Sequence, residues 1–235
     1  MSPHLDWPDC RNVRDVGGLP TSDGGRIRLG ALIRADSLHY LSPEGVDAVR
    51  RSGVSRVVDL RSPAEITGAP TPFTGDALGY RVAVQDPAVP PEGMDTIVKV
   101  CNDMLDRHPE RFAEAVLAIA EAPPGAVVVH CHGGKDRTGM VVALALSVAG
   151  VPVDEIVADY FLTKERFASA MAEQLAAEPD ESLHPEMIEF RDTRAESIVA
   201  ILDHLDTAYG GPEAYLRHGG LSTEELDVLR SRLIA

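Results

Sequence analysis

Ala126–Gly139 reads AVVVHCHGGKDRTG, and this stretch decides the fold. Its first five residues form an apolar run without polar alternation, which is typical of a central strand buried on both faces. The residues that follow, GMVVALALSVAG (139–150), are apolar nearly all round and predict a helix packed inside the protein. A strand, a glycine-containing turn and a buried helix can cradle a phosphate group, because the helix N-terminus presents unpaired backbone N–H groups. We therefore predict an α/β fold.

Shorter patterns on either side of this stretch complete the expected element order. We expect a helix that begins after Ser42-Pro43, strands over Val54–Leu60 and Gly79–Val84, and helices over roughly Met94–Asp106 and Pro109–Glu121. Beyond Val153 the pattern is almost wholly helical, with helices expected over Asp154–Lys164, Glu165–Ala177, about Pro185–Leu205 and after Ser222. These patterns predict a central, mostly parallel sheet flanked by helices, with a helix-rich C-terminal half. Neither a linker nor a repeat interrupts the chain, so we expect a single domain over residues 1–235.

The composition excludes several classes of function. The 235 residues carry 22 Lys and Arg against 37 Asp and Glu, a net charge of −15. Nucleic acids and anionic membranes attract basic surfaces, so this balance argues against both as general partners, and an anionic substrate requires a local positive site. No apolar stretch reaches the roughly 20 residues of a membrane span, and residues 1–10 lack the features of a signal peptide. We expect no stable membrane insertion and a cytoplasmic location.

The turn between the expected strand and helix carries the residues of a nucleophilic site. Cys131 stands at the entrance to the helix, where the helix dipole favours an anion, so we expect a thiolate nucleophile. Gly133 and Gly134 allow the backbone to form a concave nest for a tetrahedral oxyanion. Arg137 offers a planar fork that can bind two phosphoryl oxygens at once. Thr138 can donate a hydrogen bond to the Cys131 sulfur and help the thiolate to leave.

A Cys followed by five residues, Arg and Thr resembles the signature loop of the cysteine-dependent protein tyrosine phosphatases. The form HCxxGKDRTG resembles the bacterial tyrosine/serine phosphatases, a branch that also includes enzymes acting on phosphoinositides. Weaker motifs agree in order with that family, in the stretches NVRDVGG (12–18), GALIRA (30–35), DLRSPAE (59–65) and the segment from Tyr209 to Ser222. Together the matches run from about residue 11 to residue 230.

The resemblance implies a cysteine-phosphatase-like fold and a phosphate monoesterase. The Cys131 thiolate would attack phosphorus to give a phosphocysteine that water then hydrolyses, and no metal or cofactor would be needed. The implied substrate is a phosphotyrosine protein, with dual specificity toward phosphoserine and phosphothreonine, and inorganic phosphate is the product and expected ligand. The phosphate-binding residues would be His132, Gly133, Gly134, Lys135, Asp136 and Arg137. His130 and Arg14 would support them.

The resemblance leaves the general acid and the preferred substrate open. Asp136, inside the loop, is our first candidate for the acid, Asp59 at the end of a strand is the second, and Asp86 is a third. Asp9 lies in a Trp-Pro-Asp triplet like the acid loop of animal tyrosine phosphatases, but its position at the N-terminus favours chance. Lys135 also occurs in phosphoinositide phosphatases, where it meets an additional phosphate, so a phosphoinositide phosphatase is the main alternative.

Other interpretations stay open at lower weight. A phosphate-binding pseudophosphatase, a rhodanese-type sulfurtransferase and a His-Cys-His metal site are the rivals, but the intact loop disfavours each of them. We expect Asp15 and Arg61 to hold the structure together through buried ion pairs. Cys10 and Cys101 are expected to be structural thiols, with a reversible disulfide to Cys131 as the alternative. Residues of about 161–187 form either a surface helix pair or, as in the bacterial relatives, a lid over the site.

Overall fold

A computed structural model of the chain describes residues 5–85, 96–184, 188 and 192–235. Five strands form one sheet in the spatial order β1 (Arg14–Asp15), β2 (Leu32–Ala35), β5 (Ala126–His130), β3 (Val54–Asp59) and β4 (Gly79–Arg81). Only β1 runs antiparallel to its neighbour, and the other pairs are parallel. All five residues of β5 are buried, as the apolar run predicts. The expected α/β fold with a mostly parallel sheet is confirmed.

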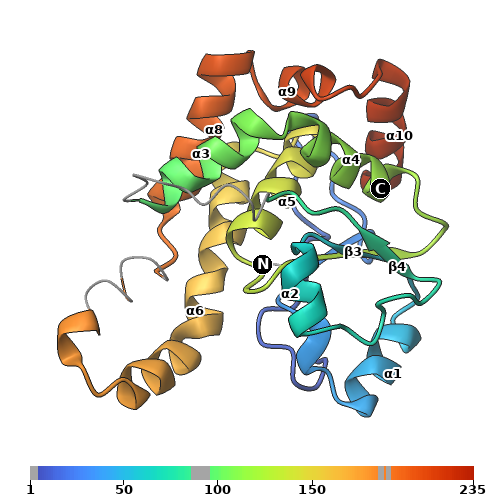
Figure 1. Cartoon of the computed structure of the whole chain (residues 1–235). Coiled ribbons are helices and arrows are strands. Elements are labelled where there is room, and N and C mark those ends of the chain that lie inside the picture. The colour runs from blue at the N-terminus through green and yellow to red at the C-terminus, as the bar shows by residue number, and fades with distance from the viewer. Residues whose placement is uncertain (1–4, 86–95, 185–187, 189–191) are drawn as a thin grey trace.

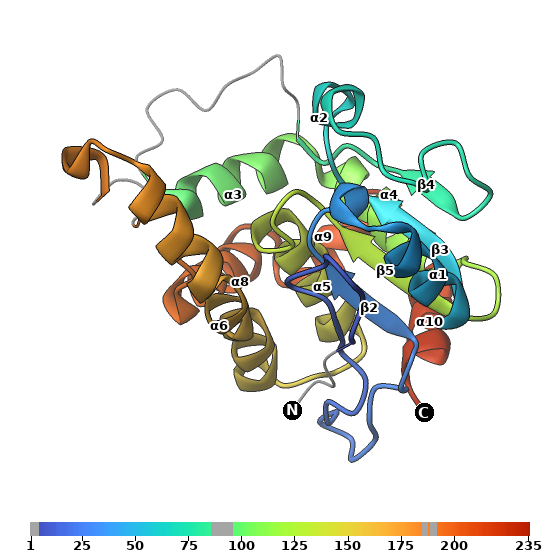
Figure 2. The same cartoon turned by 90° about the horizontal axis from the view of Figure 1, so that it is seen from below.

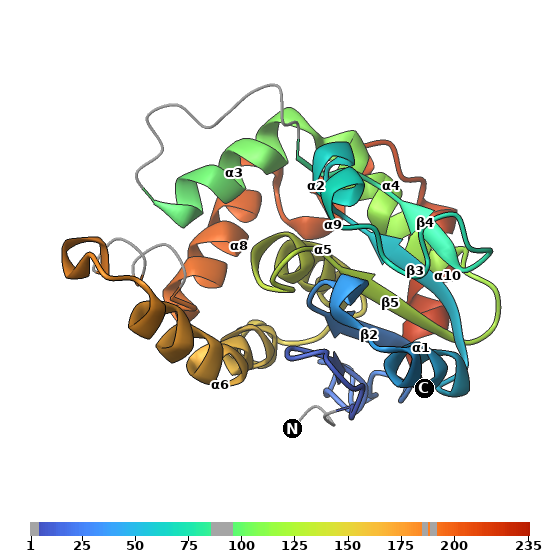
Figure 3. The same cartoon turned by 60° about the horizontal axis from the view of Figure 1, so that its bottom comes forward.

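Helices cover both faces of the sheet (Figures 2 and 3). One face carries α4 (Pro109–Ala120) and α5 (Asp136–Val148), and the other carries α1 (Pro43–Arg51). Because side chains alternate along a strand, Val127 and Val129 join the large core under α5, whereas Val128 joins a smaller core under α1. The central strand is therefore held between two apolar layers.

The second half of the chain is helical, as predicted. Its elements are α6 (Val153–Ala177), the short η2 (Glu181–Leu183), α8 (Ala195–Tyr209), α9 (Pro212–His218) and α10 (Thr223–Leu233). The helix α6 reaches past the other helices to one edge of the molecule (Figure 1). No helix among the described residues is long and apolar enough to cross a membrane.

Several predicted boundaries need correction. The two helices expected over 154–164 and 165–177 are one continuous helix, α6, of 25 residues. The helix expected from about Pro185 begins at Ala195 in the described part, because Arg194 has an extended backbone; residues 185–187 and 189–191 lie outside the described residues. The strand expected to run to Val84 ends at Arg81. The helix expected from about Met94 is α3 (Ile97–Arg107), and residues 86–95 before it lie outside the described residues.

The caps read from the sequence are present. Ser42 accepts a hydrogen bond from the Gly45 backbone at the start of α1, and Ser222 forms a capping box with Glu225 at the start of α10. Two short elements that we had not predicted, η1 (Leu38–Tyr40) and α2 (Pro63–Gly68), follow β2 and β3 respectively. Both therefore lie at the carboxyl edge of the sheet, where ligands bind in α/β folds.

Candidate active site

Cys131 lies at the carboxyl end of the central strand. The register pairs the preceding residue, His130, with Ala35 of β2 on one side and Asp59 of β3 on the other. Residues 131–135 then turn into α5, which begins at Asp136. Cys131 is buried, with only 3% of its surface exposed. The nucleophile predicted from the sequence thus sits where three strands end and an internal helix begins.

One glycine of the loop is required by its shape. Gly134 has a φ of +63°, and a Cβ atom at this position would lie 2.4 Å from the carbonyl oxygen of Ala35. Its neighbour Gly133 is less confined, since its nearest side-chain atom, Cζ of Phe167, would lie 4.0 Å from an added Cβ. The tight approach of Gly134 to β2 therefore sets the path of the loop.

Side chains from distant segments hold the carbonyl groups of the loop. The Asn12 amide donates to the carbonyl oxygens of Gly133 and Gly134 at 3.1 and 3.2 Å. The Arg34 guanidinium donates to Gly134 at 2.7 Å and to Lys135 at 3.3 Å. A trans peptide unit points its N–H opposite to its C=O, so these bonds turn the following N–H groups away from Asn12 and Arg34. Such a row of aligned N–H groups is what an anion-binding nest requires.

A buried charge cluster lies behind these contacts. Asp159 of α6 accepts from the Arg14 Nε at 2.8 Å and from the Arg34 Nη1 at 2.6 Å, and all three side chains are almost wholly buried. Burial alone would raise the pKa of Asp159, but the two guanidinium groups lower it below its ordinary value. Burial and the neighbouring Arg34 lower the pKa of Arg14 to about 10. Arg14 also donates to the Asn12 Oδ1 at 2.6 Å, so it supports the loop through a second side chain and not by direct contact.

Arg137, the other residue central to the sequence prediction, is held by Glu65. The two Glu65 oxygens accept from the Arg137 Nη1 and Nη2 at 2.7 and 2.8 Å, a bidentate pair. Glu65 is itself fixed by a capping box with Ser62 at the start of α2. Burial alone would raise the pKa of Glu65, but the hydrogen bonds and charge of Arg137 lower it to about 2. The plane of the guanidinium is thereby set before a phosphate arrives.

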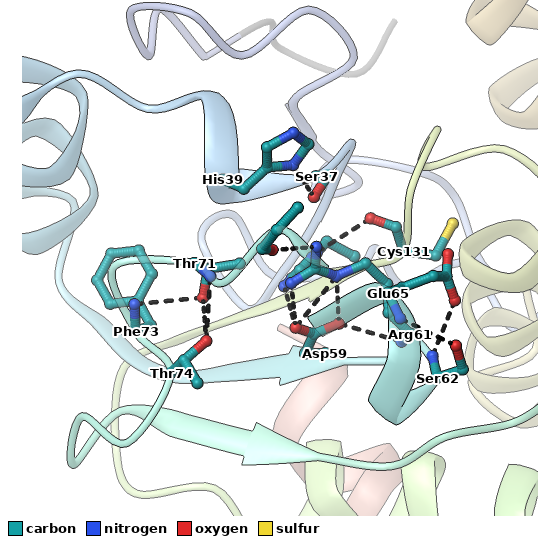
Figure 4. Close-up of polar contacts among 12 residues, drawn as sticks. Ser37, His39, Asp59, Arg61, Ser62, Glu65, Thr71, Phe73, Thr74 and Cys131 are labelled. Atoms are coloured by element: carbon teal, nitrogen blue, oxygen red, sulfur yellow. Dashed lines mark hydrogen bonds and ion pairs between the residues drawn. The ribbon is translucent and has the colours of Figure 1, made fainter. Parts of the chain in front are cut away.

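Asp59 is engaged in a different ion pair (Figure 4). Its oxygens accept from the Arg61 Nε at 2.9 Å and the Arg61 Nη2 at 2.8 Å, and the His130 Nε2 lies 3.6 Å away. Burial alone would raise the pKa of Asp59, but Arg61 and His130 lower it. Burial lowers the pKa of His130, whose Nδ1 lies 3.1 Å from the Cys131 carbonyl oxygen. Arg61 thus forms a buried ion pair, as we predicted.

Asp136 stands at the first position of α5. Its Oδ1 accepts from the Tyr160 hydroxyl at 2.9 Å and lies 3.6 Å from the Lys135 Nζ. The Lys135 ammonium also donates to the Asp192 carbonyl oxygen at 3.0 Å. Thr138 is fully buried, and its hydroxyl has no hydrogen-bond partner within the described residues, so the expected bond to the Cys131 sulfur is not formed here.

Comparison with known proteins agrees with this geometry. The family model described as the tyrosine phosphatase family matches residues 5–235. The chain belongs to this family. It is 27% identical over 277 residues to the triple specificity protein phosphatase PtpB of Mycobacterium tuberculosis, covering 97% of this chain and 98% of PtpB. It is also 29% identical to a candidate tyrosine-protein phosphatase of Cupriavidus necator (97% and 86% covered) and 28% identical to the tyrosine-protein phosphatase of Nostoc commune (91% and 78% covered).

The other candidate residues of this tyrosine phosphatase are Asp9, Asp86 and Asp15. In the Trp-Pro-Asp triplet, Trp7 is buried and donates to the Ser52 hydroxyl at 3.1 Å, so this tryptophan packs against the end of α1. Asp86 lies outside the described residues. Asp15 accepts hydrogen bonds from the Gly17 and Gly30 backbones, and among the described residues it does not form the ion pair that we expected.

The three cysteines and His132 of the loop are the last of the residues that we singled out in the phosphatase. Cys10, Cys101 and Cys131 are all free thiols. The Cys10 thiol contacts Asp36, and burial together with this carboxylate raises its pKa. His132 is exposed, and its ring stacks at 6.2 Å from that of His39. In the described part of the chain, no three His, Cys, Asp or Glu side chains are grouped to hold a metal ion.

Four positioning residues of the phosphatase were missed by the sequence analysis: Asn12, Arg34, Glu65 and Asp159. Asn12, Arg34 and Glu65 stand in the motifs NVRDVGG, GALIRA and DLRSPAE, which we had used only to support the resemblance. The spacing Ser62-x-x-Glu65 is also that of a capping box, a signal for the local role of Glu65. Asp159 carries no such signal, because a lone Asp in a helical pattern reads as solvent-exposed.

We expect the free energy of unfolding of the phosphatase to fall less with decreasing pH in the Glu65→Gln variant than in wild type. The pKa of Glu65 is lowered from 4.5 to about 2 in the folded state, so its ion pair stabilises the fold above pH 4.5 and is lost as the pH falls toward 2. After an allowance for solvent screening, the ion pair contributes about 1–2 kcal/mol to the free energy of unfolding. Urea unfolding at pH 5 and pH 3 should show a smaller drop in the free energy of unfolding for Glu65→Gln than for wild type. Glu121→Gln, at an exposed position, is the control; an equal drop in all three proteins contradicts the prediction.

Proposed function

We propose that this tyrosine phosphatase hydrolyses phosphotyrosine in proteins through a phosphocysteine formed on Cys131. The observation that carries the proposal is the pairing of Cys131, at the carboxyl end of β5, with an Arg137 that Glu65 already holds in a bidentate ion pair. A phosphoryl group in the loop would meet the thiolate on one side and the guanidinium at its equatorial oxygens. The residues present require no metal or cofactor for this reaction.

The first chemical step needs a proton for the leaving group. The Cys131 sulfur attacks phosphorus, the bond from phosphorus to the tyrosine oxygen breaks, and the carboxyl group of Asp136 gives its proton to that oxygen. In the second step a water molecule attacks phosphorus and gives a proton to the Asp136 carboxylate. The bond from sulfur to phosphorus breaks, which restores the thiolate and releases inorganic phosphate.

Asp136 suits the acid role better than Asp59 does. Both Asp59 oxygens are bound by Arg61, and the lowered pKa of Asp59 keeps it ionised, so it has no proton to give. Asp136 lies within the loop, is not in a bidentate ion pair, and its side chain is 23% exposed. We assign Asp59 to the positioning of Arg61 and His130.

The breadth of the substrate range follows from the loop and from the relatives. PtpB is named a triple specificity phosphatase, which supports activity on phosphoserine and phosphothreonine beside phosphotyrosine. A phosphoinositide is the second candidate substrate, because the Lys135 ammonium places another cation in the loop. His132, Gly133 and Gly134 complete the proposed phosphate site.

Initial rates on three substrates in the presence of a metal chelator test the proposal. We expect turnover of a phosphotyrosine peptide, slower turnover of a phosphoserine peptide, and inorganic phosphate as a competitive inhibitor of both. Turnover of a soluble phosphoinositide alone would replace the protein substrate with the lipid. A folded protein that binds phosphate but turns over none of the three would support the pseudophosphatase and overturn the proposal.

A further inference from the structure

We propose that Tyr160 is a positioning residue of the phosphatase, whose hydroxyl group fixes the Asp136 carboxyl group so that Oδ2 carries the proton for the leaving group. Tyr160 belongs to α6, and Asp136 begins α5. The inference rests on the proposed acid role of Asp136, and it adds a residue outside the signature loop to the proton-transfer step.

The contacts of Asp136 distinguish its two oxygens. The Tyr160 hydroxyl donates to Oδ1 at 2.9 Å, and the Lys135 ammonium lies 3.6 Å from the same atom. Within the described part of the chain, Oδ1 of Asp136 accepts a hydrogen bond and Oδ2 accepts none. The side chain keeps 23% of its surface exposed. One oxygen is therefore anchored, and the other is left for substrate.

Tyr160 is the donor in this contact. Burial and the Asp136 carboxylate raise the pKa of Tyr160 well above its ordinary value, so its hydroxyl keeps its proton. A carboxyl group whose Oδ1 accepts that hydrogen bond carries its own proton on Oδ2. The hydrogen bond from Tyr160 thus anchors Oδ1, and the proton for the leaving group lies on Oδ2.

The ring of Tyr160 has little freedom to leave this position. It is 2% exposed, and the residue before it, Asp159, is bound to Arg14 and Arg34. Its edge packs against α5 at Gly139, where an added Cβ would lie 2.8 Å from the Cδ2 and Cε2 atoms of the ring. Gly139 lies one helical turn after Asp136. The absence of a side chain there allows the hydroxyl to reach the carboxyl group.

The test compares two variants, each of which lacks the hydroxyl group of one buried tyrosine. Tyr160→Phe removes the donor to Asp136, and Tyr215→Phe removes a donor to the Leu105 carbonyl oxygen, also 2.9 Å long and buried. We expect Tyr160→Phe to lower kcat on phenyl phosphate about tenfold with KM unchanged, because phenolate needs the proton. On p-nitrophenyl phosphate, whose leaving group depends less on protonation, the loss in kcat should be clearly smaller. Tyr215→Phe should change neither rate.

A double-mutant cycle with Asp136→Asn shows whether the hydroxyl acts through Asp136. If it does, Tyr160→Phe has no further effect on phenyl phosphate once Asp136 is asparagine. Equal losses on both substrates, an equal loss in the Asp136→Asn background, or an unchanged kcat in Tyr160→Phe would each overturn the inference. A wild-type enzyme inactive on both esters would instead overturn the proposed function.

Gly139→Ala provides a second route to the same step. This variant keeps the Tyr160 hydroxyl but pushes the ring away from α5. We expect it to show the same dependence on the leaving group, and a loss that is equal for phenyl and p-nitrophenyl phosphate would count against the inference. Thermal unfolding of both variants confirms that the rates belong to folded protein.

Discussion

We expect Cys131→Ser to lower kcat by about 10⁵-fold or more on every substrate that the wild type hydrolyses. A serine hydroxyl at this position is a far weaker nucleophile than a thiolate, and His130, buried with its Nδ1 against the Cys131 carbonyl oxygen, is not positioned as a base for it. The phosphate site itself stays in place, because the loop is held by Asn12 and Arg34. Initial rates with a phosphotyrosine peptide, together with inorganic phosphate binding by calorimetry, measure the two effects separately.

Cys10→Ser is the matched control for this prediction. It makes the same exchange of sulfur for oxygen, and serine can keep the hydrogen bond to Asp36. We expect its rates to equal those of wild type. A Cys131→Ser enzyme that retains more than a hundredth of the wild-type kcat would show that the thiolate is not the nucleophile.

The second large effect is expected from Arg137→Lys, which keeps the charge but removes the planar fork. We expect a loss of about 10³-fold in kcat/KM. A lysine ammonium cannot hold both Glu65 oxygens and bridge two phosphoryl oxygens, so the charge that develops in the transition state loses its preorganised partner. Steady-state rates on the phosphotyrosine peptide, with KM and kcat resolved, provide the measurement.

The same exchange at an exposed position controls for general effects of the substitution. Arg107 forms an exposed ion pair with Asp103 in α3, so Arg107→Lys should leave the rates unchanged. If Arg137→Lys stays within tenfold of wild type, bidentate binding by the guanidinium is not what the loop contributes, and the proposed role of Glu65 fails with it.

Features determined by neighbouring residues could be predicted from the sequence. The apolar run over 126–130 reads as a buried strand, and Ser42 and Ser222 read as caps, because each pattern needs only the residues beside it. The break that we placed after Lys164 was wrong for a local reason. The sequence from 153 to 177 contains neither glycine nor proline, so nothing ends the helix there.

The positioning of the site could not be read in the same way. The proposed nucleophile, Cys131, and Arg137 lie within one decapeptide, and the roles that we propose for them could be predicted from it. The contacts of Arg34 with the loop span 100 residues, and those of Asp159 with Arg14 span 145. Only the fold brings such residues together. The two alternatives for residues of about 161–187, a surface helix pair or a lid, and the single domain over 1–235 stay predictions.

The order in which the chain is synthesised gives those long spans a further meaning. Arg14 and Arg34 leave the ribosome well before the loop that they support, and Asp159, the carboxylate that both arginines bind, leaves after it. A nascent chain that stops short of α6 contains Cys131 and Arg137 but must leave two arginines without a buried carboxylate, which the folded core does not tolerate. We therefore expect a chain that ends before α6 to lack phosphatase activity, so that the site becomes competent only after α6 has been synthesised.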